Sequence, residues 1–255
     1  MLKILPIYKP VGFTPFEVVK TIKQVNPKLS KVKMGYAGRL DPLAHGVLLL
    51  MIGEETKNRD YYLSLPKTYD FEVVFGVQTD TYDVLGLIEK TSLPINNVNL
   101  FVNKYVNKTI GKSLQTYPPY SSKTVQGKPL FWWARQGKLS EIEMPTREIE
   151  IFDFAVIAMG NIELHNLQQK VMDSLNSVRG DFRQEEIKSR WRQYFMQQKK
   201  DTKLITAKFK IVCSSGTYIR ELINNMGQEL ECGAVALNIY RTSVGEFTMK
   251  NALIL

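Results

Sequence analysis

The sequence has few of the residues that bind metals or form disulfide frameworks. Its 255 residues include two cysteines, Cys213 and Cys232, and two histidines, His45 and His165. These are too few for a set of disulfides or for a zinc cluster. Both cysteines stand among apolar residues, so we expect buried, reduced thiols. The sequence therefore predicts no metal site.

Long apolar runs are missing as well. No stretch approaches the ~20 apolar residues that a membrane-spanning helix needs, and the N-terminus has no apolar region of the kind found in signal peptides. A phosphate-binding loop and a dinucleotide-binding fingerprint are also absent, which excludes the common nucleotide-cofactor sites. We expect a cytoplasmic protein that does not use a membrane.

The composition is that of a globular protein with a basic surface. Hydrophobic residues make up 44% of the chain, enough for a sizeable core, and the length suits one large domain or two small ones. The formal net charge is +9 and the sequence pI is about 9.4. This balance favours a polyanionic partner such as nucleic acid.

A glycine-rich loop at residues 34–46 carries a single acid, Asp41. The apolar run 47–52 follows it and predicts a buried strand. Two interpretations are open. Asp41 and Pro42 can simply begin a turn, which the local spacing alone favours, or an acid on a loop at the rim of the core can perform chemistry.

The loop resembles the catalytic loop of the TruB family of tRNA pseudouridine synthases, whose pattern is close to G-H-(A/G)-G-x-L-D-P-x-A-x-G. Further blocks resemble that family in the same order and cover most of residues 4–159 and 204–247. These blocks are Tyr8 to Thr14, Lys67 to Tyr69, Thr79 to Asp83, Gly127 to Leu130 with Ala134 and Arg135, Gly216 to Arg220, and Cys232 to Ala234 with Arg241, Thr242, Val244 and Gly245. The resemblance implies a single α+β catalytic domain over residues 1–255, with the pseudouridine synthase fold. We expect a central mixed, largely antiparallel sheet with flanking helices and an active-site cleft.

The activity that the resemblance implies is isomerisation of uridine 55 in the T loop of tRNA. The N1–C1′ bond is cut, the base turns, and the base is rejoined through C5. The reaction is redox-neutral, so we expect no cofactor. It needs an ionised carboxylate as nucleophile or base, and the resemblance assigns that role to Asp41. It also assigns Arg220 as the planar guanidinium that offsets desolvation of the carboxylate; the alternative for Arg220 is an ordinary arginine at a helix start.

The resemblance extends to residues that would bind the target nucleotide. Tyr69 matches the tyrosine that stacks on the base and whose hydroxyl can take part in proton removal from C5; its alternative is a core tyrosine on a strand. The other candidates for substrate binding are Tyr36, Lys67, Tyr218 and Ile239. Tyr36 replaces the family's histidine, Ile239 replaces a leucine, and His45 replaces a small hydroxyl residue.

Periodicity and capping signals predict the remaining elements. Thr14, Pro15 and Glu17 form a capping box that begins a helix ending before Pro27, with a buried stripe that includes Val25. Thr217 is predicted to cap a later helix. Strands are expected at 4–8, 67–76, 85–88, 147–159, 205–213, 235–240 and 244–247, and helices at 96–107 and 218–230.

Two segments stand apart from the regular pattern. Residues 117–146 are irregular, aromatic and basic; their tryptophans can stack on RNA or simply pack on a short helix. In the family this region is a mobile loop that closes over the RNA. Residues 160–203 carry two apolar helical stripes and predict a helical hairpin added to the family core, removable without loss of the chemistry. Its second half is basic as far as Lys200, and a solvated helix face is the favoured interpretation.

The expected partner is the T arm of tRNA, bound by a monomer without an obligate protein partner. The chain ends about eight residues after Phe247, so we expect no C-terminal RNA-binding (PUA) domain. Two rival functions are a catalytically silent tRNA-folding chaperone and a sister pseudouridine synthase that acts on other RNAs. The joint presence of Asp41, Tyr69 and Arg220 argues against the first.

Overall fold

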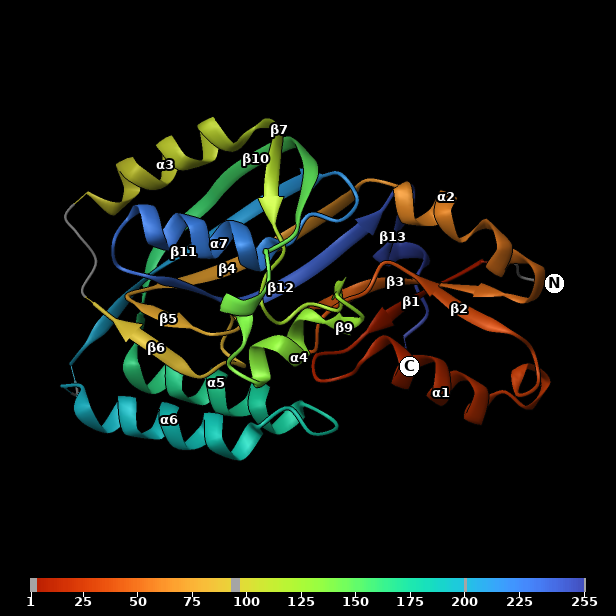
Figure 1. Ribbon diagram of the computed structural model, residues 1–255, viewed down its shortest axis with the longest axis horizontal. Helices are drawn as coiled ribbons and strands as arrows, with labels where there is room; N and C mark the ends of the chain where they lie inside the picture. Colours follow the sequence, from red (N-terminus) through yellow and green to blue (C-terminus); the bar gives the residue numbers. More distant parts are fainter. Residues whose placement is uncertain (1–3, 93–96, 200, 255) are drawn as a thin grey trace.

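The computed structural model describes residues 4–92, 97–199 and 201–254. Its centre is a nine-stranded sheet with the path β1-β3-β12-β4-β11-β10-β7, in which β2 also pairs with β3 and β13 with β12 (Figure 1). The strands are β1 (Ile4–Lys9), β2 (Met34–Ala37), β3 (His45–Ile52), β4 (Lys67–Phe75), β7 (Gly111–Thr116), β10 (Thr146–Glu163), β11 (Lys203–Cys213), β12 (Ala234–Val244) and β13 (Phe247–Thr248).

One parallel junction joins the two halves of this sheet. β12 pairs with β3 in parallel only through Tyr240 opposite His45 and Arg241 opposite Gly46. The other pairings within the sheet are antiparallel. The sheet is therefore mixed and largely antiparallel, and the α+β prediction is confirmed.

Helices and short turns of 3-10 helix flank the sheet. In Figure 1, α3 and α7 lie over its upper part and the α5–α6 hairpin lies below it. The helices are α1 (Pro15–Val25), α2 (Arg59–Ser64), α3 (Val98–Thr109), α4 (Leu130–Arg135), α5 (Leu164–Ser177), α6 (Gln184–Gln197) and α7 (Ile219–Glu229), and the 3-10 turns are Pro27–Leu29, Gly53–Asn58, Leu139–Glu141 and Met249–Asn251. Two ribbons stand outside the main sheet: β5 (Val77–Thr79) with β6 (Ile88–Thr91), and β8 (Thr124–Val125) with β9 (Lys128–Pro129).

α1 begins with the capping box that the sequence predicts. The side chain of Thr14 accepts a hydrogen bond from the backbone of Glu17, and the Glu17 carboxylate accepts one from the backbone of Thr14. α1 ends at Val25, before Pro27, and packs Val18 and other apolar residues on β1 and β3. Val25 itself is exposed, so its predicted place in the buried stripe is wrong.

The predicted helical hairpin is present as α5 and α6, between the paired ends of β10 and β11. Its apolar stripes are buried, with Leu167, Val171, Ile187 and Trp191 fully covered. They belong to the same core cluster as the side chains of β4, β10 and β11. This burial argues against the expectation that the hairpin can be removed without loss of the chemistry; its status as an addition to the family core stays a prediction.

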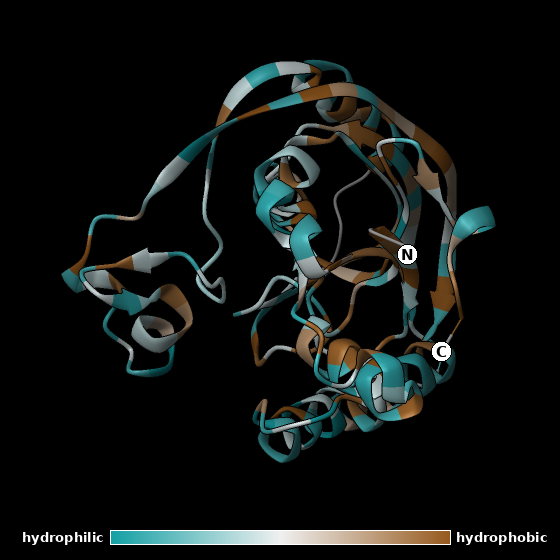
Figure 2. Ribbon diagram, turned by 90° about the vertical axis from the view of Figure 1, so that its right-hand side faces the viewer, coloured by the Kyte–Doolittle hydropathy of each residue, from teal (hydrophilic) through white to brown (hydrophobic). Residues whose placement is uncertain are grey.

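The segment between β7 and β10 lies in front of the sheet in Figure 1, and in the turned view of Figure 2 it projects from the body of the protein. Within it, the indole nitrogen of Trp133 donates to the carbonyl of Val125 at 3.2 Å, and Trp132 meets Trp133 edge-on. Trp133 therefore takes part in packing inside the segment. Phe131, by contrast, is exposed and lines a cavity described below.

Several predicted boundaries differ from the structure. Leu85 is not in a strand, because residues 80–87 form the turn between β5 and β6. Thr217 does not cap α7; its hydroxyl donates back to the carbonyl of Ser214 at 3.0 Å, and Tyr218 occupies the cap position without a side-chain bond. β10 is longer than expected because it continues along β11 as far as Glu163. Lys200 and the expected helix start at residue 96 lie outside the described residues.

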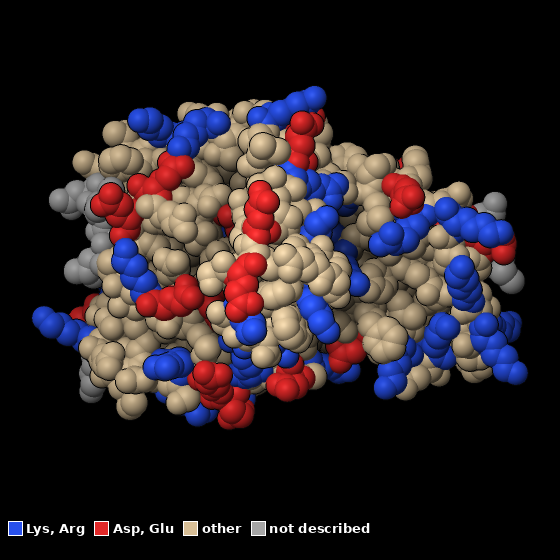
Figure 3. Space-filling model, viewed as in Figure 1, with Lys and Arg blue, Asp and Glu red and all other residues tan. Residues whose placement is uncertain are grey.

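Positive charge is unevenly spread over the surface. On the face shown in Figure 3, Lys and Arg predominate over the right-hand part of the molecule, where α1, α2 and β1 to β3 lie in Figure 1, while both signs mix over the remainder. Among the described residues, no helix is long and apolar enough to cross a membrane. The same part of the chain contains no group of three or more acidic, histidine or cysteine side chains arranged to hold a metal ion.

Candidate active site

Asp41 lies on the loop between β2 and β3, and Arg241 fixes the shape of that loop. The buried guanidinium of Arg241 donates to the carbonyls of Gly38 at 3.1 Å and Val47 at 2.7 Å. Gly46 has φ +109°, and a Cβ there would lie 2.2 Å from the carbonyl oxygen of Arg241. Glycine is therefore required where the loop returns to β3.

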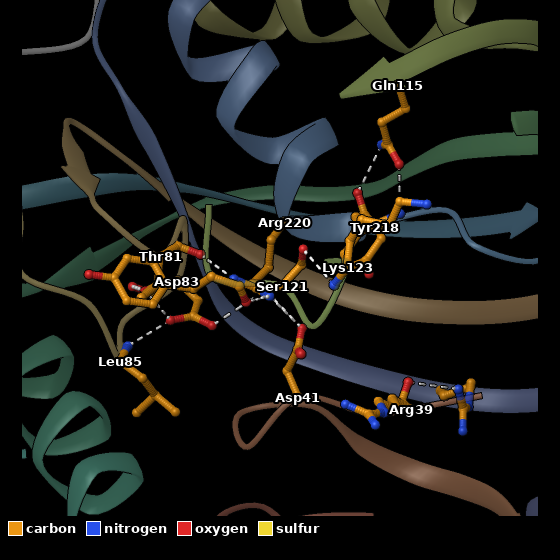
Figure 4. A network of polar contacts seen from close by, with 12 residues as sticks. Arg39, Asp41, Thr81, Asp83, Leu85, Gln115, Ser121, Lys123, Tyr218 and Arg220 are labelled. Carbon is orange, nitrogen blue, oxygen red and sulfur yellow. Dashed lines mark hydrogen bonds and ion pairs between the residues drawn. The ribbon is translucent and has the colours of Figure 1, made fainter. Parts of the chain in front are cut away.

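Arg220, in the first turn of α7, contacts Asp41 through two nitrogens (Figure 4). Its Nε and Nη2 both lie 2.8 Å from Oδ2 of Asp41. Its remaining donors bind backbone carbonyls: Nη1 that of Thr81 at 2.6 Å and Nη2 that of Tyr120 at 3.2 Å. The guanidinium is thus fixed by three separate segments of the chain, while the side chain of Asp41 keeps 37% exposure. The pairing of Asp41 with Arg220 is as predicted from the sequence, and both contacts fall on one carboxylate oxygen.

A second carboxylate faces the same arginine. Oδ2 of Asp83 lies 3.8 Å from Nε of Arg220, and its Oδ1 accepts hydrogen bonds from the Thr81 hydroxyl at 2.6 Å and from the backbone of Leu85 at 2.9 Å. Asp83 ends one of the blocks that resemble the family, but its role was not predicted from the sequence. The available signal was an Asp in a turn-rich stretch, because an Asp side chain there accepts from the backbone two residues on, here Leu85.

The charges of this group are coupled. Burial alone would lower the pKa of Arg220, but the carboxylates of Asp41 and Asp83 outweigh it and raise that pKa above its usual value. Burial raises the pKa of Asp83 to about 6, although the charge of Arg220 and the Thr81 hydroxyl oppose the rise. A buried arginine needs such partners, because an uncompensated charge away from water is costly.

A cavity of about 290 Å³ brings the sequence-predicted residues together. All of them line it: Tyr36, Asp41, Lys67, Tyr69, Tyr218, Arg220 and Ile239. They come from β2, the loop after it, β4, α7 with its cap, and β12. A second cavity, of about 520 Å³, lies against the same Asp41 and Arg220. It is lined also by the start of α1, by the α5–α6 turn and by the connection between β7 and β10, called here the 117–145 segment. The paired acid and arginine therefore border both cavities.

The aromatic walls of the smaller cavity are held in place. Tyr69 is buried on β4, and burial raises the pKa of its hydroxyl although Arg241 opposes the rise. The side-chain amide of Gln115 accepts from the backbone nitrogen of Tyr218 at 2.8 Å and donates to its carbonyl at 3.0 Å (Figure 4). Burial raises the pKa of Tyr218 to about 12. Both tyrosines are therefore neutral at physiological pH, and Gln115 fixes the backbone of Tyr218.

Lys67 lines the cavity, and its ammonium group is hydrogen-bonded to backbone carbonyls. Its Nζ donates to the carbonyl of Leu63 at 2.6 Å and to that of Leu65. Burial lowers the pKa of Lys67 to about 8. Its role in substrate binding stays a prediction.

His45 lines neither cavity and instead packs against neighbouring strands. Its ring bonds to Asn238 at 2.9 Å and to the Tyr8 hydroxyl at 3.1 Å, and it stacks on Tyr240. Burial lowers its pKa. The side chain of His45, on β3, therefore links β1 and β12 where the three strands meet.

Comparison with known proteins defines the class. A model of the TruB family of pseudouridylate synthases, for the N-terminal domain, matches residues 23–174. The chain is 34% identical over 253 residues to the tRNA pseudouridine synthase B of Clostridium novyi, a match covering 98% of this chain and 70% of that protein. It is 29% identical over 249 residues to the protein of the same name from Aquifex aeolicus, again covering 98% and 70%. The chain belongs to the TruB family of pseudouridylate synthases.

Two solved structures share the fold. One is an H/ACA RNP bound to a substrate RNA containing 2′-deoxyuridine, with a TM-score of 0.58 and 18% identity. The other is a Cbf5-Nop10-Gar1 complex, with a TM-score of 0.59 and 18% identity. Each match covers 99% of this chain, which spans about half the length of the matched chain, 50% and 52% respectively. At this identity the likeness concerns the fold.

Proposed function

We propose that the protein converts uridine 55 in the T loop of tRNA to pseudouridine without a cofactor. The observation that carries the proposal is Asp41, held by Arg220 at the rim of a cavity with Tyr69 and Tyr218 in its walls, in a chain of the TruB family. The tRNA substrate is supported by the relatives, which are named tRNA pseudouridine synthase B.

Asp41 is the group that would act on the target nucleotide, as nucleophile or base. Arg220 orients the carboxylate by two contacts to one oxygen, Oδ2. A guanidinium fixed by the carbonyls of Thr81 and Tyr120 supplies this charge without rearranging during the reaction. The carboxylate remains partly exposed, as a group that must meet a substrate has to be.

The cavity would hold the base outside the RNA stack. A uridine within a folded loop must leave its stack to reach Asp41, and an extruded base is held by stacking and apolar contact. Tyr69, Tyr218 and Ile239 offer these surfaces. We assign Tyr69 the further role of assisting proton removal from C5, because it lines the same cavity as Asp41.

The segment 117–146 would cover the bound RNA. It carries Lys123 over the ring of Tyr117 and Lys128 over the ring of Trp132, both with Nζ 5.4 Å from the ring centroid. Such cation–aromatic pairs at the surface can contact phosphates and bases together.

The proposal is tested with a tRNA transcript that carries tritium at C5 of its uridines. Closure of the new bond at C5 expels that hydrogen, so one equivalent of tritium per tRNA should be released, with pseudouridine appearing at position 55. A transcript with cytidine at position 55 should release none. Binding without release would overturn the proposal in favour of the chaperone, and release from other positions would indicate a sister synthase.

A further inference from the structure

The turn between α5 and α6, residues 178–183, reaches the larger cavity beside Arg220. Asp181, Phe182 and Arg183 line that cavity. The turn is tied to the 117–145 segment, because Nη2 of Arg135 donates to the carbonyl of Asp181 at 3.3 Å. The hairpin thus extends from the core to the active site.

Arg183 makes two contacts at this place. Its Nη1 lies 2.9 Å from Oδ2 of Asp80, with side-chain exposures of 20% and 15%. Its guanidinium also lies over the ring of Tyr120, 4.6 Å from the centroid. Arg183 has φ +63°, a left-handed conformation that is uncommon outside glycine. The turn therefore adopts an unfavourable backbone at the residue whose side chain joins Asp80 to Tyr120.

The two residues that Arg183 joins belong to the two segments that hold Arg220. Asp80 precedes Thr81, whose carbonyl accepts from Nη1 of Arg220, and Tyr120 offers its own carbonyl to Nη2. The other oxygen of Asp80 accepts from the backbone of Leu87 at 2.8 Å, which fixes the same turn. A shift of either segment would move a carbonyl away from Arg220.

We propose that Arg183 is a positioning residue, which sets the orientation of Arg220 toward Asp41 by clamping Asp80 to Tyr120. The inference rests on the proposed function, and it makes the hairpin part of the support of the active site. A planar guanidinium is needed because it pairs with the carboxylate and lies on the ring at once.

The kinetic test compares Arg183→Gln and Arg183→Lys with a matched control, Arg179→Gln. Arg179 is in the same turn and also lies over an aromatic ring, that of Phe13 at 3.7 Å. Arg183→Gln should lower the single-turnover rate by about tenfold or more, because small misplacements of a reacting group are costly. The tRNA Kd and the Tm should stay close to the wild-type values. Arg183→Lys, which keeps the ion pair alone, should fall between, and Arg179→Gln should match the wild type.

A double-variant cycle separates positioning from general support. If Arg183 acts through Arg220, Arg183→Gln should cost much less in an Arg220→Lys background than in the wild type. Equal, multiplicative losses would overturn the proposal, as would equal rates for Arg183→Gln and Arg179→Gln.

Hydrogen exchange of the Arg220 side chain gives a readout that needs no activity. The Arg220 side chain is 4% exposed, so its Nε–H should exchange slowly with water in nuclear magnetic resonance spectra. Arg183→Gln should speed that exchange by about tenfold or more, by freeing the two carbonyl-bearing segments for local opening. Unchanged exchange would overturn the positioning role. Faster exchange together with an inactive wild type would instead reject the proposed function and leave the positioning role standing.

Discussion

Asp83 has a protonation state that is set by its burial next to Arg220. Its exposure is 3%, and its pKa in the folded chain is raised to about 6, against ~3.9 for an ordinary Asp. Arg220 and Asp41 are the charged groups that act on it. Because the folded chain binds this proton more tightly than the unfolded chain, the contribution of Asp83 to stability is fully present below about pH 4 and is lost as pH rises through about 6.

Asp83→Asn removes this titration. The unfolding free energy of the wild type, relative to the variant, should fall by up to roughly 3 kcal/mol between pH 4 and pH 7, from a shift of about two pKa units. Urea unfolding at a series of pH values measures the difference. A difference that does not vary with pH would show that Asp83 titrates as it does in the unfolded chain.

Tyr69→Phe separates stacking from proton transfer. The phenyl ring keeps the apolar wall of the cavity, so tRNA affinity should stay within about threefold, while loss of the hydroxyl should slow turnover by ~100-fold, the scale of one general acid–base group. Tyr69→Ala should lose both affinity and rate. Single-turnover kinetics and filter binding measure the two effects. If the Phe variant turned over as fast as the wild type, Tyr69 would be a stacking platform alone.

At the scale of residues, motif blocks identified the groups that line the smaller cavity but not the groups that hold them. Asp41, Tyr69 and Arg220 were found because each stands in a block that resembles the family. The side chain of Gln115 hydrogen-bonds the backbone of Tyr218, more than a hundred residues away in the sequence. A local sequence pattern does not predict such a contact. Arg241 stands in a family block, but its hydrogen bond to the loop at Gly38, from the far end of the chain, was not predicted. Long-range hydrogen bonds of this kind become visible only when the sheet has formed.

At the scale of elements, the hairpin offers a clear stability prediction. Replacing residues 164–197 by a Gly/Ser linker should abolish cooperative unfolding, because it would expose the β-sheet side chains that α5 and α6 cover. Circular dichroism during heating measures this. A cooperative, active protein after the replacement would restore the expectation of a removable addition.

A single substitution provides a milder form of the same test. Trp191 is fully buried, and Trp191→Ala should cost ~3–5 kcal/mol of unfolding free energy, as other large-to-small core changes do. The neighbouring, exposed Arg190→Ala is the control and should change stability by less than about 0.5 kcal/mol.

The elements that could be predicted are those with strong local signals. The capping box at Thr14 and the alternation along 205–213 each depend on neighbours within a few residues. The strand expected at 85–88 begins only at Ile88. The side chains of Asp83 and Asp80 accept hydrogen bonds from the backbone of Leu85 and Leu87, which favours a turn over an extended strand. The extension of β10 to Glu163 depends on pairing with β11, and a local pattern does not show it.

At the scale of the whole molecule, the recognition surfaces assigned here lie around Asp41. The two cavities adjoin it, and the 117–145 segment and Asp181 to Arg183 line the larger one. We therefore predict that this 255-residue chain modifies an isolated T-arm stem-loop with a kcat/KM within about tenfold of whole tRNA, a gap of about 1.4 kcal/mol. The two substrates should show similar salt dependence, because they offer similar numbers of phosphates. A preference of a hundredfold for whole tRNA, with a steeper slope, would indicate contacts beyond the T arm.

The central claim is that Asp41 performs the chemistry and Arg220 holds it in place. The most direct measurement is tritium release from tRNA by Asp41→Asn, with binding and thermal unfolding measured on the same preparation. The amide is nearly isosteric and removes the charge and the nucleophile, so turnover should be abolished while the tRNA Kd and the fold stay close to those of the wild type. Activity within tenfold of the wild type would contradict the assignment of Asp41.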